Sequence, residues 1–209
     1  MADLAALTAA IEAGDRATAT AVTAAAIEQG LDPETILAAM TTAMEVVGFK
    51  FQRNEVYVPE MLIAARAMKE STALLEPLLS AAGIRPEFTA VIGTVQGDLH
   101  DIGKNLVGMM WKGANIEVID LGSDVPPDRF VAAAREHRAS LVGISALLTT
   151  TMVGMRAVVE AIRAADLESV KVVVGGAPVT VAFADEIGAD GYAPDAASAV
   201  DVAKRVLGR

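Results

Sequence analysis

Residues 89–114, TAVIGTVQGDLHDIGKNLVGMMWKGA, join two kinds of local structure. The run TAVIGTV, residues 89–95, is apolar or β-branched almost throughout, which is typical of a buried strand. The run DIGKNLVGMMWKGA, residues 101–114, has the length and composition of a helix. The loop between them holds His100, one of only two histidines in the chain, two residues after Asp98. This segment predicts a strand, a loop and a helix, with unusual polar residues where the strand ends.

The same alternation continues to the end of the chain. Short β-branched runs occur at 116–122, 141–145, 171–176 and 190–194, with helical segments between them and a last helix at 195–207. Strands that alternate with helices of this length are typical of a parallel, doubly wound sheet. The runs are apolar almost throughout, as expected when helices cover both faces of the sheet. We therefore expect an α/β domain with five parallel strands.

Residues 1–82 have the spacing of helices instead. Gly14 and Gly30 are placed to end the first two helices, and Asp32 followed by Pro33 is a typical start for the third. Short turns between four helices predict a small antiparallel bundle. The turn-rich segment AAGIRPEF, residues 81–88, predicts a boundary, so we expect a helical domain over 1–85 and the α/β domain over 86–209.

The composition excludes several classes of function. The chain has no cysteine, which rules out disulfides, thiolate catalysis and iron–sulfur clusters. Its net charge of −10 argues against nucleic acid as a partner, because phosphate binding needs clustered basic residues. Neither a signal peptide nor an apolar run long enough for a membrane span is evident. We expect a cytoplasmic protein that binds neither nucleic acid nor membrane.

Four predicted loops bring distinctive residues to one edge of the sheet. Loops that follow parallel strands meet at their carboxyl ends, where doubly wound sheets bind ligands. These residues are Gly97, Asp98, His100 and Asp101 after the first strand, Ser145, Leu147, Thr149 and Thr151 after the third, Gly175 and Gly176 after the fourth, and Tyr192 in the fifth. We therefore predict a ligand site at this edge.

The residues alone leave the role of His100 open. An isolated histidine is most often an ordinary loop or helix-capping residue. A metal ligand is the second interpretation, since metal-bound histidines commonly donate their other ring N–H to a carboxylate such as Asp98. A phosphate loop fits less well, because GDLHDIGKN, residues 97–105, lacks the glycine-rich phosphate motifs and would place two carboxylates beside the anion.

Three short patterns, in order, resemble the signature of cobalamin-binding domains: Asp98-x-His100-x-x-Gly103, Ser145-x-Leu147 and Gly175-Gly176. GDLHDIGKNLV is similar to the corresponding loop of cobalamin-dependent methionine synthase, and residues 43–77 resemble the helical cap of that enzyme. The chain equally resembles the small corrinoid proteins of methyltransferase systems. The resemblance runs from residue 4 to the end, and it implies a helical cap before a Rossmann-like or flavodoxin-like cobalamin-binding domain.

The resemblance implies that cobalamin binds with its nucleotide base removed from the cobalt and His100 as the lower axial ligand. Asp98 would then hold His100, and Thr151 stands where methionine synthase has a serine that extends this relay. Ser145 and Thr149 would hydrogen-bond the buried nucleotide tail. The other implied contacts are Leu147, Gly175 and Gly176 along the tail, and Gly97, Asp101, Ile102, Gly103, Tyr192 and Ala196 elsewhere; an ordinary strand-end turn also explains the glycine pair. Lys104 and Asn105 are placed to touch the corrin side chains.

The cap of this family covers the methyl-bearing face of the cofactor. Tyr57 aligns with an aromatic residue that touches the methyl group, although the family has Phe there. Met44 and Met61 would be its neighbours, and both fit a bundle core equally well. Because the cap must move aside for methyl transfer, residues 81–88 are the expected hinge.

The function implied is that of a methyl carrier that alternates between Co(I) and methyl-Co(III). Its partners would be a substrate-specific methyltransferase, a second methyltransferase that passes the methyl group to tetrahydrofolate or coenzyme M, and a reductive activator protein. The chain has no zinc-binding Cys/His set of its own, so we do not expect catalysis by it alone. A methylamine, methanol, a methoxylated aromatic compound or a betaine could each be the methyl donor.

Three other functions remain as alternatives. A B12-dependent photoreceptor shares both domains but adds a DNA-binding domain. The cobalamin subunit of a mutase normally lacks a helical cap, which residues 1–82 argue against. A cobalamin storage protein is excluded by no feature of the sequence.

Overall fold

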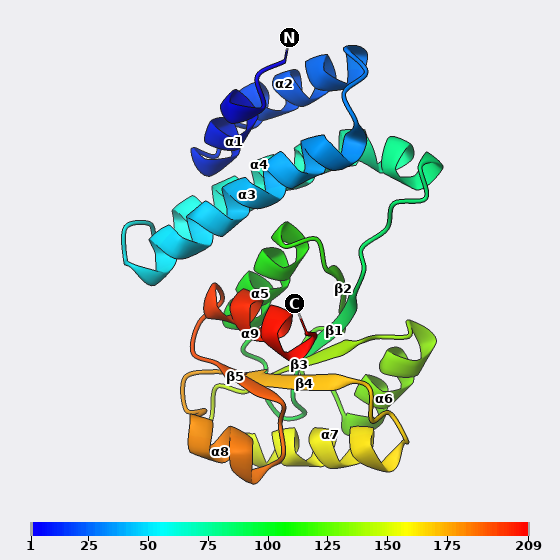
Figure 1. Cartoon of the computed structure of the whole chain (residues 1–209). Coiled ribbons are helices and arrows are strands. Elements are labelled where there is room, and N and C mark those ends of the chain that lie inside the picture. The colour runs from blue at the N-terminus through cyan, green and yellow to red at the C-terminus, as the bar shows by residue number, and fades with distance from the viewer. Residues whose placement is uncertain (1, 209) are drawn as a thin grey trace. The chain divides into compact units, whose positions relative to one another are not determined.

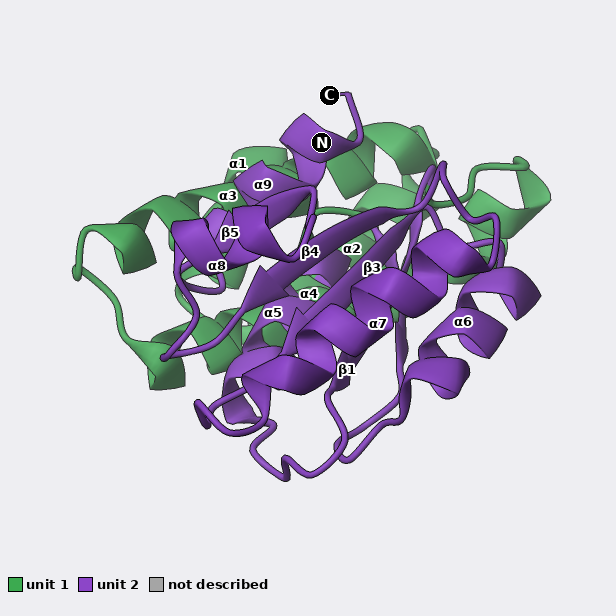
Figure 2. Ribbon diagram, turned by 90° about the horizontal axis from the view of Figure 1, so that it is seen from below, with its two compact units in different colours: residues 1–86, 113–115 green, residues 87–112, 116–209 purple. Residues whose placement is uncertain are grey.

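The computed structural model describes residues 2–208, which form two compact units. One unit comprises the chain up to Pro86 together with Gly113–Asn115 (Figure 2). The other comprises Glu87–Lys112 and the chain from Ile116 onward. No helix within residues 2–208 combines the length and the apolar character needed to cross a membrane.

The first unit is helical, and its third helix begins at Pro33, as the sequence predicts. It contains α1 (Leu4–Glu12), α2 (Arg16–Glu28), α3 (Pro33–Gln52) and α4 (Val58–Ala81) (Figure 1). The side chains of Asp3, Asp15 and Asp32 each accept a hydrogen bond from a backbone N–H in the first turn, which caps the first three helices. Gly14 and Gly30, both at φ 71°, follow the ends of α1 and α2.

Apolar side chains from all four helices fill the centre of this unit. Those that are fully or almost fully buried include Leu7, Ile11, Ile36, Met40, Met44, Met61 and Leu75. Ser71 of α4 is also fully buried. Within the described residues its hydroxyl oxygen is the one buried side-chain polar atom that lacks a hydrogen-bond partner. An unpaired buried hydroxyl destabilises the folded state.

Ser71→Ala is therefore expected to stabilise the protein. Removal of the unpaired hydroxyl should raise the free energy of unfolding by about 1 kcal/mol or more, measured by urea denaturation. Ser80→Ala is the matched control, because Ser80 lies on the same helix but is exposed, and alanine improves the helix propensity at both sites. An equal gain in both variants would mean that the hydroxyl of Ser71 costs nothing.

The second unit is a parallel sheet with the strand order β2-β1-β3-β4-β5, which confirms the doubly wound fold. The order reverses between β1 and β3, so their carboxyl ends flank the switch point. The strands are β1 (Thr89–Thr94), β2 (Glu117–Asp120), β3 (Leu141–Ser145), β4 (Lys171–Gly175) and β5 (Gly191–Ala193). The helices are α5 (Ile102–Gly113), α6 (Pro127–Glu136), α7 (Met152–Ala164), α8 (Val181–Glu186) and α9 (Ser198–Val206).

The third strand has the predicted bounds, whereas the other four strands and the last helix are shorter than the sequence suggests. Val95 leaves the ladder and forms an isolated bridge with Val125 instead. Gly176, at φ 132°, turns away from β4. The last helix begins at Ser198 rather than at 195, because the Asp195 carboxylate accepts hydrogen bonds from the backbone N–H and the hydroxyl of Ser198.

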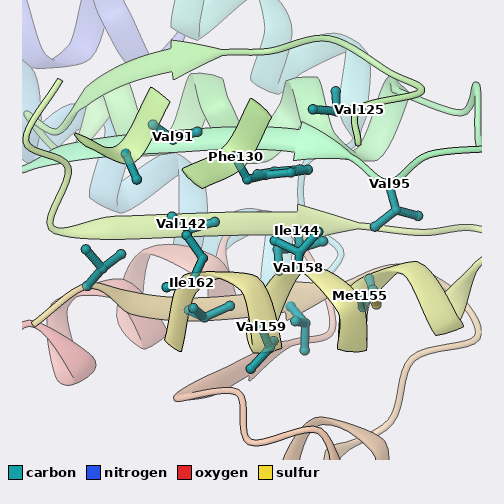
Figure 3. Packing of buried hydrophobic residues seen from close by; sticks show 14 of the residues in the cluster. Val91, Val95, Val125, Phe130, Val142, Ile144, Met155, Val158, Val159 and Ile162 are labelled. Atoms are coloured by element: carbon teal, nitrogen blue, oxygen red, sulfur yellow. The ribbon is translucent and has the colours of Figure 1, made fainter. Parts of the chain in front are cut away.

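Helices cover both faces of this sheet. Figure 3 shows Phe130 of α6 and Met155, Val158 and Ile162 of α7 packed against side chains from the strands, and α8 adds to the same buried cluster. On the opposite face, the ring of Trp111 lies against Gly143, where a Cβ would be 2.6 Å from the ring. The Trp111 indole N–H donates to the carbonyl oxygen of Ala199 at 2.9 Å, which links α5 to α9.

Asp190 joins the start of β5 to β4 and α7. Its carboxylate accepts from the backbone N–H of Val172 at 2.7 Å and from Arg163 at 2.7 Å, and Lys171 lies 3.4 Å away. Burial raises the pKa of Asp190, but the hydrogen bonds from Val172 and Arg163, with the charges of Arg163 and Lys171, outweigh it and lower the pKa below its usual value.

Asp190→Asn should lower the free energy of unfolding by about 1–3 kcal/mol at pH 7. Because the folded-state pKa lies below the value of about 3.9 for an unfolded aspartate, the stabilisation is complete above about pH 4. It is lost as the pH falls through the folded-state pKa, so the difference from wild type should shrink below pH 4. Urea denaturation across pH measures this, with exposed Asp185→Asn as the control. A difference that does not depend on pH would contradict the charge-based explanation.

Candidate functional site

The predicted site lies at the carboxyl ends of β1 and β3, beside the switch point of the sheet. The loop that follows β1 turns back at Gly97 and presents Asp98 and His100 before α5 begins. Asp98 is completely buried, whereas half of the His100 side chain (52%) is exposed. The Asp98 Oδ1 atom lies 2.7 Å from His100 Nδ1 and accepts from the backbone N–H of His100 at 3.0 Å.

Groups from the loop between β3 and α7 complete the surroundings of Asp98. Its Oδ2 atom accepts from the backbone N–H of Leu147 at 2.8 Å and of Leu148 at 3.4 Å. The Thr151 hydroxyl, just before α7, donates to the same oxygen at 2.7 Å. Burial raises the pKa of Asp98, but the hydrogen bonds from Leu147, Thr151 and His100 outweigh burial and hold the pKa far below its usual range.

The ionised Asp98 sets the tautomer of His100. An ionised carboxylate only accepts hydrogen bonds, so Nδ1 of His100 carries the proton that faces Asp98. The Nε2 atom is then left with a free lone pair. A neutral imidazole whose Nδ1–H is held by a carboxylate is the usual form of a metal-binding histidine. The structure thus brings His100, Asp98 and Thr151 together as a chain of hydrogen bonds.

The glycine pair has a structural reason of its own. A Cβ on Gly176 would lie 1.9 Å from the carbonyl oxygen of Ala146, and one on Gly175 would lie 2.8 Å from that of Ala193. Real Cβ atoms do not approach backbone atoms this closely. The two glycines therefore let the backbones at the ends of β3, β4 and β5 come together, whatever contact they also make with a ligand.

Gly103 is different, because the chain itself does not need a glycine there. No atom lies within 4 Å of a Cβ built at this position, and glycine weakens the first turn of α5 relative to alanine. Leu99 and Ile102 on either side of His100 are 73% and 74% exposed. Open space over a glycine, exposed apolar side chains and a free imidazole nitrogen fit a large, partly apolar group that carries a metal.

Ser145 and Thr149 lie near this point. Ser145 ends β3 and is half-buried, and Thr149 is exposed in the loop that also holds the exposed side chain of Leu147. The resemblance implies a contact of the Leu147 side chain with the nucleotide tail, while the structure adds a role for the Leu147 backbone N–H at Asp98.

The structure shows the surroundings of the remaining residues that were predicted to contact the cofactor. Asp101 accepts a hydrogen bond from the Asn105 side chain at 3.1 Å. Tyr192 is half-buried against the core of the sheet, and Ala196 is buried. In the helical unit, Tyr57 is exposed at the start of α4, whereas Met44 and Met61 are buried. Their contact with a cofactor stays a prediction.

Lys104 does not project toward a ligand as the sequence suggested. Its side chain is almost fully buried, and its ammonium group donates to Asp120 Oδ2 at 2.6 Å and to the Asn105 side chain at 2.7 Å. The ion pair ties the first turn of α5 to the end of β2. Sequence reasoning also missed Thr94, whose buried hydroxyl donates to the carbonyl oxygen of His100 at 3.0 Å. A polar residue inside an otherwise apolar strand was the available signal.

The two classes of glycine should respond oppositely to substitution. Gly176→Ala is expected to destabilise the protein by about 3 kcal/mol or more, because the Cβ overlaps backbone at a φ that L residues rarely adopt. Gly103→Ala should leave the free energy of unfolding of the cofactor-free protein unchanged or raise it by up to about 1 kcal/mol, while weakening the binding of cobalamin. Thermal denaturation and a cobalamin titration measure these effects, and unchanged cobalamin affinity in Gly103→Ala would contradict the second one.

The strand order and the candidate site at the switch point place the chain in the class of doubly wound proteins, which bind ligands at this edge of the sheet. A family model described as a B12 binding domain matches residues 88–201, and a second model of the same description matches residues 4–76. The chain belongs to the corrinoid proteins that combine these two domains, and its cofactor is a cobalamin-type corrinoid.

Particular relatives agree over nearly the whole chain. Dimethylamine corrinoid protein 3 of Methanosarcina acetivorans is 46% identical over 84% of this chain and 83% of its own. The crystal structure of a novel cobalamin-binding protein from Desulfitobacterium hafniense DCB-2 matches with a TM-score of 0.83 at 30% identity, over 99% of both chains. The methanol:cobalamin methyltransferase complex MtaBC from Methanosarcina barkeri matches with a TM-score of 0.85 at 28% identity, over 98% of this chain and 79% of that one. The resemblance to corrinoid proteins is confirmed.

Proposed function

We propose that this protein is a methyl carrier that binds cobalamin with its nucleotide base off and His100 on the cobalt, and that it passes a methyl group between two methyltransferases. The observation that carries this proposal is the buried Asp98 carboxylate, which holds His100 with its Nε2 atom free. The relatives add support, because one is a dimethylamine corrinoid protein and another belongs to a methanol:cobalamin methyltransferase complex.

The protein would act on the cofactor through the hydrogen bonds behind His100. When bound, the cobalt supplies the methyl-accepting and methyl-donating chemistry. His100 Nε2 would be the lower ligand, with the proton kept on Nδ1 by the ionised Asp98. Thr151 and the backbone N–H of Leu147 keep Asp98 ionised and in place. This arrangement orients the ring before the cofactor arrives and so reduces the ordering that binding requires.

The other predicted contacts complete the binding site in this proposal. Ser145 and Thr149 would hydrogen-bond the nucleotide tail, since both are hydroxyl residues near the end of β3. Gly103 would leave room for the corrin, as the open space above it suggests. In the helical domain, residues 1–85, we propose that Tyr57, Met44 and Met61 shield the methyl group and that residues 81–88 act as a hinge.

The proposed partners are a substrate-specific methyltransferase, a methyltransferase that transfers the group to tetrahydrofolate or coenzyme M, and a reductive activator protein, all in the cytoplasm. The methyl donor stays open among methylamines, methanol, methoxylated aromatic compounds and betaines. Assays of methyl transfer with candidate methyltransferases would choose among them. Tight cobalamin binding without transfer from any donor would favour a storage protein instead.

Reconstitution with hydroxocobalamin tests the axial ligand directly. After reduction to Co(II), the electron spin resonance spectrum of the wild type should show coupling to a histidine nitrogen, because His100 Nε2 is the free donor. His100→Ala should lose this coupling. His137→Ala is the matched control, since His137 is the only other histidine and lies exposed at the end of α6. If His100→Ala keeps the nitrogen coupling, or if the wild type retains no cobalamin, the proposal fails.

A further inference from the structure

The loop between β2 and α6 holds the backbone of the His100 loop, and we propose that Asp124 is a positioning residue for the axial histidine. Its Oδ1 atom accepts from the backbone N–H of Gly97 at 2.7 Å. Its own backbone N–H donates to the carbonyl oxygen of Asp98 at 3.0 Å. Asp124 is therefore hydrogen-bonded to Gly97 and Asp98, the two residues at which the chain turns from β1 toward His100. This inference rests on the proposed function, because it assigns a role toward the ligand that His100 would provide.

Asp124 is itself held by a rigid part of the sheet edge. On one side, the carbonyl oxygen of Gly122 accepts from the N–H of Thr94 at 3.0 Å. On the other side, the N–H of Val125 donates to the carbonyl oxygen of Thr94 at 3.0 Å, and Val125 is buried. Both flanks of Asp124 are thus fastened to the end of β1. Because its neighbours are hydrogen-bonded to β1, Asp124 can hold the loop after β1 in a fixed position relative to that strand.

The backbone conformation of Asp124 suits this role. Its φ is 58°, in the left-handed region that Asp and Asn enter more readily than most other residues. The conformation points both the carboxylate and the backbone N–H of one residue at the same short segment. Gly97, its partner, is exposed and has φ 83°, so this turn has little other support from side chains.

The contacts of Asp124 complement those of the Asp98 carboxylate. Leu147 and Thr151 hold the side chain of Asp98, whereas Asp124 holds its backbone. The orientation of the His100 ring depends on the Asp98 side chain and on the loop backbone, because the ring is hydrogen-bonded to the Asp98 carboxylate and attached to that backbone. Asp124 is exposed, so its side chain contributes little to the core. The two hydrogen bonds to the loop are its main structural role, and this separates positioning from general stability.

Two substitutions separate the acceptor from the backbone conformation. Asp124→Asn keeps an oxygen that can accept from Gly97 and tolerates the positive φ. Asp124→Gly also keeps the φ and its own N–H to Asp98, but it removes the acceptor. Ser123→Gly is the matched control, because it adds the flexibility of a glycine to the same loop and leaves Asp124 intact.

The first measurement uses the cofactor-free protein. Amide hydrogen exchange by NMR should show that the Gly97 N–H exchanges at least about tenfold faster in Asp124→Gly than in wild type. Asp124→Asn and Ser123→Gly should stay close to wild type. Unchanged exchange at Gly97 in Asp124→Gly would show that the hydrogen bond does not hold the loop, which overturns the proposal.

The second measurement uses protein loaded with cobalamin. Asp124→Gly should bind cobalamin roughly 3- to 10-fold more weakly, the effect of losing one hydrogen bond, and a smaller fraction of its Co(II) should show histidine nitrogen coupling. Asp124→Asn should restore both. Faster Gly97 exchange with unchanged affinity and coupling would leave Asp124 a purely structural residue and overturn the proposal. His100→Ala, measured alongside, separates this proposal from the proposed function. If His100→Ala loses the nitrogen coupling while Asp124→Gly keeps it in full, only the role of Asp124 fails. If His100→Ala keeps the nitrogen coupling, the axial assignment of His100 fails and the role of Asp124 fails with it.

Discussion

The buried carboxylate of Asp98 is the constraint on which the site depends. An ionised group with no exposed surface is stable only if donors surround it, and here the donors come from two loops of the chain. His100 contributes from the loop after β1, and Leu147 and Thr151 contribute from the loop between β3 and α7. The charge that orients the histidine therefore also fixes the two loops at the switch point against each other.

The parallel sheet explains why these segments meet. Because β1 and β3 are neighbours and run in the same direction, the loops after them leave the sheet side by side. The close approach continues toward β5, where Gly175 and Gly176 leave no room for a Cβ against the neighbouring backbones. On the other side of β1, the end of β2 is joined to the first turn of α5, directly after that loop, through Asp120 and its partner Lys104. The site is thus supported from both sides of β1.

The geometry around His100 and Gly103 is consistent with the membership of the chain in the corrinoid family. The chain has a histidine in the loop after β1, and the hydrogen bond to Asp98 shows how the chain orients that histidine while its ring stays partly exposed. Gly103 also relates the structure to the family. The folded chain has no use for a glycine there, whereas the proposed binding of a bulky cofactor would give it one. Chemistry at the cobalt is a property of the cofactor, whereas orientation and space are properties of this chain.

The sequence by itself determined the features that depend on near neighbours. The cap of the third helix at Asp32, the alternation of strand and helix, and the placement of Asp98 two residues before His100 all follow from local sequence. Contacts between distant segments were decided by the tertiary structure, because they depend on the order of the strands in the sheet. Three contacts are of this kind: the hydrogen bond from the Leu147 N–H to Asp98, the ion pair of the buried Lys104 with Asp120, and the hydrogen bond from the Gly97 N–H to Asp124. A sequence pattern can name a residue such as Leu147, but only the folded sheet decides whether its side chain or its backbone is used.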